Sequence, residues 1–163
     1  MNKIILSIDP GYERLGLAVL KKNERGVIDL LHSECFKTSA KNQFVDRLVE
    51  IGHRVNEIIS EFNPTVLAIE NLFLQNNQKT VMKVSETRGV LLYVARVLQL
   101  SVFELTPLQI KAAVTGSGRS DKKGMQKMVD ILLPAMKKKT SLLDDEYDAV
   151  ACGLAYFALE KSL

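Results

Sequence analysis

The chain has 163 residues, of which 47% are hydrophobic and 25% charged, and its formal net charge is +3. This length suits one domain with a substantial core and is too short for two ordinary domains, so we predict a single domain over 1–163. No apolar run is long enough to cross a bilayer and the N-terminus lacks a secretion signal, which predicts a cytoplasmic protein without membrane contacts. The mild positive charge permits a polyanionic partner but does not require one.

Two cysteines and two histidines limit the metal chemistry that is open to the chain. Cys35 and Cys152 lie far apart and lack the spacing of a zinc site, so we expect both to be buried free thiols. Only His32 and His53 could supply imidazole ligands. Any bound metal must then be held mainly by oxygen atoms, which favours magnesium or manganese over zinc.

Three strands are predicted at the start of the chain. Apolar residues at positions 4–8 indicate a buried strand that stops at Asp9-Pro10-Gly11, which places a carboxylate at a strand end. Runs at 15–20 and 27–36 follow after short turns and predict an antiparallel start to the sheet. An acid before Pro-Gly also suits a simple Asx turn, so Asp9 alone does not indicate a function.

A helix over 44–62 is predicted next, because apolar residues recur there at three- and four-residue intervals. A short buried strand at 66–69 then leads into Glu70, a second carboxylate at a strand end. In the helix expected over 81–99, the half from 89 to 98 is apolar nearly all round. Such a helix needs cover on two sides, one from the sheet and the other from the rest of the monomer or from a second copy of the chain.

The second half of the chain is predicted to add a strand at 101–105 and three helices. Thr106-Pro107 marks the start of the first helix, and the segment 116–120 ends it. Ser120 is expected to cap the second helix, whose first turn holds a lysine pair that a solvated loop would explain equally well. With the last helix at 143–160, the order of elements describes an α/β domain with a five-stranded mixed sheet flanked by helices.

Acidic residues open the last predicted helix, and Asp148 lies beside its apolar face. Asp144 and Asp145 are both helical neighbours of Asp148, at four and three residues. Ser141 and Asp144 match a capping-box-like pattern, which would employ Asp144 locally and leave Asp145 to pair with Asp148. Solvated acids near a helix N-terminus would give the same pattern.

We hypothesise that four carboxylates converge at one edge of the sheet: Asp9, Glu70, Asp145 and Asp148. Four carboxylates in a small volume repel one another unless divalent cations neutralise them or some of them bind protons. Two such cations about 3.5–4 Å apart would activate a water and stabilise the leaving oxygen of a phosphodiester. The pattern therefore favours phosphodiester hydrolysis.

Four segments, in this order and spacing, resemble the bacterial RuvC Holliday-junction resolvases: IDPGYERLGLAV, AIENLF, the Lys111–Lys123 segment and DDEYDAVACGLA. The likeness covers about 3–160. It implies a ribonuclease H-like fold, a homodimer, and magnesium-dependent paired nicking of four-way DNA junctions in recombination and repair, with manganese as a substitute. A branch-migration complex at the junction is a further partner in this interpretation.

The resemblance also assigns roles by position. It implies that the four acids bind metal and catalyse, and that Phe73 stacks on bases near the junction, although Phe73 can equally fold back onto the core. It implies DNA contacts for Lys111 and Lys122, beside which we predict phosphate contacts for Arg119 and Lys123. The alternatives are a ribonuclease H-like nuclease that cuts RNA or another branched DNA, and a junction-binding module without catalysis. An actin-like ATPase is disfavoured because it needs two lobes.

Overall fold

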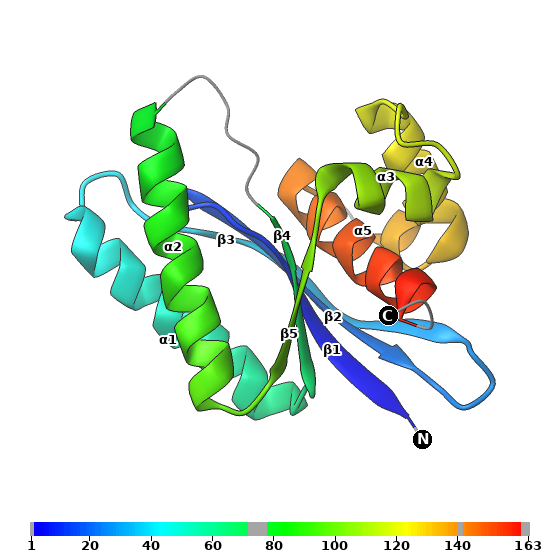
Figure 1. Cartoon of the computed structure of the whole chain (residues 1–163), viewed down its shortest axis with the longest axis horizontal. Coiled ribbons are helices and arrows are strands. Elements are labelled where there is room, and N and C mark those ends of the chain that lie inside the picture. Colours follow the sequence, from blue (N-terminus) through cyan, green and yellow to red (C-terminus); the bar gives the residue numbers. More distant parts are fainter. Residues whose placement is uncertain (1, 72–77, 140–141, 161–163) are drawn as a thin grey trace.

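The computed structural model describes residues 2–71, 78–139 and 142–160, and its strands form one sheet in the order β3-β2-β1-β4-β5. β1 (Lys3–Asp9) pairs antiparallel with β2 (Arg14–Lys22), which pairs antiparallel with β3 (Ile28–Lys37). β4 (Val66–Glu70) and β5 (Ser101–Leu105) continue the sheet parallel to β1. The carboxyl ends of these three parallel strands therefore meet at one edge (Figure 1). The predicted mixed sheet is confirmed.

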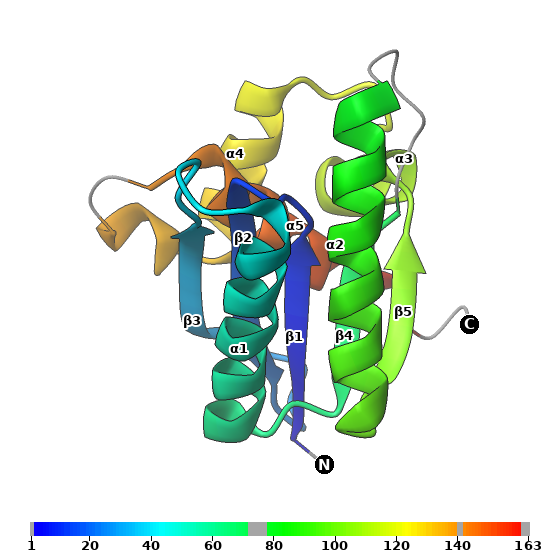
Figure 2. The ribbon, with the colours of Figure 1, turned by 90° about the vertical axis from the view of Figure 1, so that its left-hand side faces the viewer.

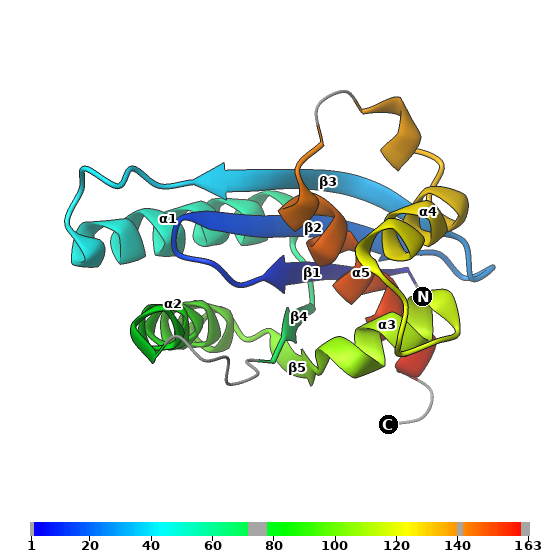
Figure 3. The same cartoon turned by 90° about the horizontal axis from the view of Figure 1, so that it is seen from above.

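Helices cover both faces of this sheet. α1 (Phe44–Phe62) and α2 (Gln78–Val97) lie side by side over one face (Figure 2). The other face carries α3 (Pro107–Thr115), α4 (Lys122–Leu132) and α5 (Asp144–Leu159), with the short 3-10 helix η1 (Met136–Lys138) between α4 and α5. Seen from above, the sheet runs between the two helical layers (Figure 3).

Alternating side chains of the strands fill two separate cores. On β1, Leu6 and Ile8 belong to the cluster under α1 and α2, whereas Ile5 belongs to the cluster around α5. All three are completely buried, as expected when successive side chains point to opposite faces of a covered sheet. The strand that ends in Asp9 is thus fixed from both sides.

α5 is buried along most of its length against β1 and β2. Gly153 allows this close approach, because a Cβ there would lie 2.5 Å from Leu20 Cδ1 and 2.7 Å from Ser7 Oγ. The prediction of a last helix is confirmed, with ends one residue inside the predicted ones. The packing of α5 against the sheet therefore determines where the side chains of its first turn lie.

The outward face of α2 is not covered by the rest of the monomer. Leu91 and Ala95 are completely buried toward the sheet, but Tyr93 and Val97 remain 70% and 59% exposed. These exposed side chains border an apolar groove of about 540 Å³ between α1 and α2. The interpretation that the monomer alone buries this helix all round is therefore wrong.

The helix caps follow the sequence only in part. Thr106 caps α3 as predicted, through a hydrogen bond from Gln109 N. α4 is capped by Asp121 rather than Ser120, because the Asp121 side chain accepts a hydrogen bond from Gly124 N at 2.8 Å. Within the three described ranges, no helix is long and apolar enough to span a membrane.

Candidate active site

Asp9 and Glu70 lie side by side at the carboxyl edge of the sheet. Asp9 ends β1 and Glu70 ends β4, and the parallel register pairs the residues directly before them. The first turns of α5 pack near this edge and carry Asp145 and Asp148. The structure therefore brings the four predicted acids to one region of the molecule.

The charges of these acids act on one another. Burial raises the pKa of Asp9 to about 8, with further contributions from the carboxylates of Glu70, Asp148 and Asp145. Burial and the charge of Asp148 raise the pKa of Glu70 to about 7. The pKa of Asp148 is also raised, chiefly by burial. Ionising Asp9, Glu70 and Asp148 together is unfavourable, so a cation bound among them would relieve a repulsion that the fold creates.

The backbone of Asp145 rests directly on β2 at Gly16. A Cβ at Gly16 would lie 2.0 Å from the carbonyl oxygen of Asp145 and 3.2 Å from Asp9 Cβ. Gly16 is also the partner of Asp9 in the antiparallel register. This glycine therefore sets how closely the head of α5 approaches the end of β1.

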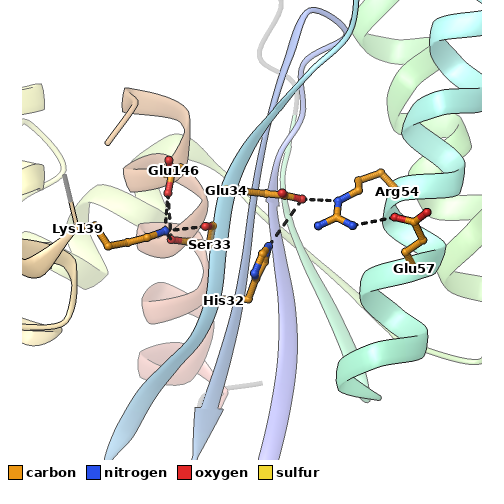
Figure 4. A network of polar contacts seen from close by, with 7 residues as sticks. All are labelled: His32, Ser33, Glu34, Arg54, Glu57, Lys139 and Glu146. Carbon is orange, nitrogen blue, oxygen red and sulfur yellow. Dashed lines mark hydrogen bonds and ion pairs between the residues drawn. The ribbon is translucent and has the colours of Figure 1, made fainter. Parts of the chain in front are cut away.

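A polar network ties the first turn of α5 to β3 (Figure 4). Lys139 Nζ donates to the carbonyl and hydroxyl oxygens of Ser33 at 2.6 and 2.7 Å and to Glu146 Oε2 at 3.0 Å. On the opposite face of β3, Glu34 accepts a hydrogen bond of 2.7 Å from Arg54 of α1 (Figure 4). Polar contacts therefore hold β3 on both faces, and Glu146 ties the first turn of α5 to it.

Asp144 is engaged by α4 rather than by a helix cap. Its carboxylate accepts a hydrogen bond from Gln126 Nε2 at 2.9 Å and pairs with Lys122 Nζ at 3.1 Å, and Lys122 lowers its pKa. The capping-box interpretation is wrong, because the N-cap of α5 is Leu143, with no side-chain hydrogen bond. Asp144 is thus the first helical residue and turns toward α4, whereas Asp145 contacts Arg14 of β2.

A pocket of about 290 Å³ lies beside the acids. Two of the predicted acids and two of the predicted lysines line it: Glu70, Asp148, Lys111 and Lys122. Both lysines act on the acids, since Lys122 Nζ lies 3.6 Å from Asp148 Oδ2 and Lys111 lowers the pKa of Glu70. The pocket therefore combines anionic and cationic groups between the end of β4 and the helices α3, α4 and α5.

The remaining predicted DNA contacts are placed differently. Arg119 and Lys123 are exposed and do not line this pocket. Phe73 lies outside the described residues. Cys152 is a buried free thiol as predicted, but Cys35 is only half-buried, and its Sγ donates to Asp145 Oδ2 at 3.7 Å.

Three residues of the site were missed by the sequence analysis: Arg14, Gly16 and Arg88. Arg88 is 6% exposed and donates to the backbone carbonyl of Glu70 and to the carboxylate of Glu104. It ties α2 to the ends of β4 and β5. The helical spacing from Leu91 and Ala95, both buried, could have indicated a buried guanidinium at this position.

The donor atoms at this edge fit a hard divalent cation, since all four acids offer carboxylate oxygens. As the side chains stand, however, no group of three or more His, Cys, Asp or Glu residues in the described part of the chain is arranged to hold a metal ion. Basic side chains already pair with three acids at the head of α5: Asp144, Asp145 and Asp148. The site thus has suitable chemistry, but its carboxylates are not gathered around one point.

The mixed sheet, with acids at the ends of two neighbouring parallel strands and at the head of a helix packed across it, has the arrangement of the ribonuclease H-like fold class. The family model described as "Crossover junction endodeoxyribonuclease RuvC" matches residues 5–156. The chain belongs to this family. The predicted fold is confirmed, and family membership does not favour the alternatives of an RNA-cutting nuclease or a non-catalytic module.

Individual relatives match over nearly their whole length. The crossover junction endodeoxyribonuclease RuvC of Alkaliphilus metalliredigens is 42% identical over 155 residues, covering 94% of this chain and 92% of that protein. The Petrotoga mobilis protein of the same name is 35% identical, covering 98% and 96%. A solved structure of Thermus thermophilus RuvC in complex with a Holliday junction substrate superposes with a TM-score of 0.90 at 29% identity, covering 98% and 96%.

Proposed function

We propose that this protein is a divalent-metal-dependent endonuclease that resolves four-way DNA junctions by symmetric paired nicks. The observation that carries the proposal is the placement of Asp9 and Glu70 on neighbouring strand ends beside Asp148 of α5: burial raises the pKa values of all three, and the charge of Asp148 raises those of Asp9 and Glu70 further. Such a group stores electrostatic repulsion that a cation relieves. Family membership supplies the substrate, because relatives are named for crossover junctions.

The proposed ligands of the metal are Asp9, Glu70, Asp145 and Asp148. Magnesium, or manganese in its place, would supply an activated water and charge stabilisation for the leaving oxygen, with two ions per site. Lys111 and Lys122 lie in the pocket beside these acids and would hold the phosphates that flank the scissile bond. Arg119 and Lys123 would add backbone contacts from outside the pocket, and Phe73 would stack on a base.

A substrate panel tests the proposed activity. We expect the protein with magnesium to cut a four-way junction in preference to a flap, a linear duplex and an RNA–DNA hybrid of the same sequences. Denaturing gels of strand-labelled substrates would report the cuts, and symmetric products from two opposed strands are the expected pattern. Preferential cleavage of the hybrid would assign the site to RNA instead.

Magnesium is expected to stabilise the folded protein more at about pH 8 than at about pH 6. The raised pKa values of Asp9 and Glu70 mean that the folded state binds more protons than the unfolded state, so the metal-free protein loses stability as pH rises from about 4 toward about 8. Magnesium binds the deprotonated folded form and reverses this loss. At a concentration of 100 times Kd it contributes about 2.7 kcal/mol, or about 5–10 °C in Tm.

Thermal unfolding with and without magnesium at the two pH values measures this effect. Asp9→Asn should raise the Tm of the metal-free protein at the higher pH and weaken the response to magnesium. A magnesium shift that is equal at both pH values, or that survives unchanged in Asp9→Asn, would contradict the proposed ligand set.

We further propose that the apolar groove between α1 and α2 is the homodimer interface. Its lining includes Val45, Val49, Tyr93 and Val97, all of which are more than half exposed in the monomer. A second copy with the same groove would cover these side chains and form a two-fold symmetric interface. Two active sites related by this symmetry suit the two opposed strands of a four-way junction.

Val97→Glu is expected to give a monomer, because the charge would be desolvated in the middle of the interface. Val27→Glu is the matched control, since Val27 is 52% exposed and lies outside the groove. Sedimentation equilibrium would report the mass of both variants. A dimer that survives Val97→Glu would place the interface elsewhere.

The single domain over 1–163, the branch-migration partner and the cytoplasmic location stay predictions from the sequence.

A further inference from the structure

Arg14 and Asp145 form an ion pair at the rim of the acidic site. Arg14 is the first residue of β2, and its Nη2 donates to Asp145 Oδ2. The same carboxylate oxygen accepts the Sγ hydrogen of Cys35, on β3, at 3.7 Å. Two neighbouring strands therefore hold this oxygen on the side of β2 and β3, whereas Asp9 and Glu70 end β1 and β4.

A basic side chain also occupies the acids on the other side of the α5 head. Lys122 Nζ lies 3.1 Å from Asp144 Oδ2 and 3.6 Å from Asp148 Oδ2. Among the described residues, no three potential ligands are arranged to hold a metal ion. Arg14 and Lys122 thus both pair with carboxylates at the head of α5, one from each side.

We propose that Arg14 is an exchangeable counter-ion, which pairs with Asp145 in the metal-free protein and moves to a phosphate of the DNA backbone when a divalent cation takes its place. The inference rests on the proposed function, because it takes Asp145 as a metal ligand. The Arg14 side chain is 46% exposed, so its guanidinium can turn outward without opening the core. A divalent cation at Asp145 repels the guanidinium, and a phosphate offers it two acceptor oxygens.

This role predicts the opposite sign of effect from simple positioning. If Arg14 only oriented Asp145 for the metal, removing the guanidinium would weaken metal binding. If Arg14 competes with the metal for Asp145, removing it strengthens metal binding in the absence of DNA. The same removal weakens binding of DNA only when metal is present, because only then has the guanidinium left Asp145.

The first experiment titrates magnesium into the full chain without DNA and measures Kd by calorimetry. We expect Arg14→Gln to lower Kd by about two- to fivefold, the range for a partly exposed ion pair, and Arg14→Lys to lie between Arg14→Gln and the wild type. Lys37→Gln is the matched control, because Lys37 is exposed and faces Arg14 in the register of β2 and β3. It should leave Kd unchanged.

The second experiment measures affinity for a four-way junction against salt concentration, with and without calcium as a cation that need not support cutting. With calcium, Arg14→Gln should flatten the slope of log K against log salt by about 0.9, the loss of one phosphate contact. Without calcium, the slope should match that of the wild type.

An unchanged or higher magnesium Kd in Arg14→Gln would overturn the exchange, as would the same slope change with and without calcium. A failure of the proposed metal site looks different, because neither the wild type nor Arg14→Gln would then give a magnesium heat, and the exchange would be overturned with it. A heat in Arg14→Gln alone would support the exchange.

Discussion

Asp145→Asn is expected to reduce junction cleavage by about 10³-fold or more, whereas Asp144→Asn should cost less than about threefold. The two acids are adjacent, but Asp145 adds to the charge that acts on Asp9, while Asp144 is 56% exposed and bound by Lys122 and Gln126 of α4. A metal ligand contributes negative charge that an amide cannot replace. Comparing the two variants therefore distinguishes the loss of a metal ligand from the general effect of removing one negative charge at the start of α5.

Single-turnover cleavage of a labelled junction under saturating protein gives the rate of the chemical step for both variants. Junction affinity, measured with calcium, should stay within a few-fold of the wild type for each, which shows that the loss is not one of binding. Asp9→Asn and Asp148→Asn should behave like Asp145→Asn. If Asp144→Asn were the inactive variant and Asp145→Asn the active one, the ligand set proposed here would be wrong at this position.

Gly16→Ala is expected to reduce cleavage by about 10²-fold while the protein still folds. The added methyl group would meet the carbonyl oxygen of Asp145 at 2.0 Å, and backbone cannot move aside as a flexible side chain would. The head of α5 must then shift away from β2, and displacements of about 1 Å in an active site can cost about 10²-fold in rate. No charged or polar side chain changes, so a loss of activity reports geometry alone.

Gly89→Ala is the matched control for this variant. Gly89 lies on α2, and a Cβ there would have no neighbour within 4 Å. Alanine should stabilise the helix by about 0.5–1 kcal/mol and leave cleavage unchanged. Thermal unfolding would measure the stability of both variants, and single-turnover cleavage would measure the rate of the chemical step. Full activity in Gly16→Ala would show that the approach of α5 to β2 is not what places Asp145.

The sequence was sufficient to predict the strand ends that carry Asp9 and Glu70, because each apolar run stops at an acid and the hydrophobic period changes there. It was also sufficient to predict the helix that carries Asp148, because the apolar face of that helix indicates that the helix is buried. These features depend on the spacing of apolar residues within one short segment, which is what hydrophobic periodicity detects.

The contacts that the sequence did not predict join residues far apart in the chain. The ion pair between Arg14 and Asp145 spans 131 positions, and no spacing rule connects them. Gly16 looked like an ordinary strand residue, because its closest contact, the backbone of α5, comes from the other end of the chain. Apart from the family resemblance, the preference for Asp145 over Asp144 depends on a helix cap that does not form. The position of α4, which engages Asp144, gives this preference its physical reason.

A crystal structure with manganese, located by its anomalous scattering, would test the central claim most directly. The account predicts a manganese ion coordinated by Asp9 and Glu70 together with an acid from the first turns of α5, with Arg14 turned away from Asp145. Manganese bound only elsewhere, with Asp9 and Glu70 free of the ion at saturating concentration, would contradict it.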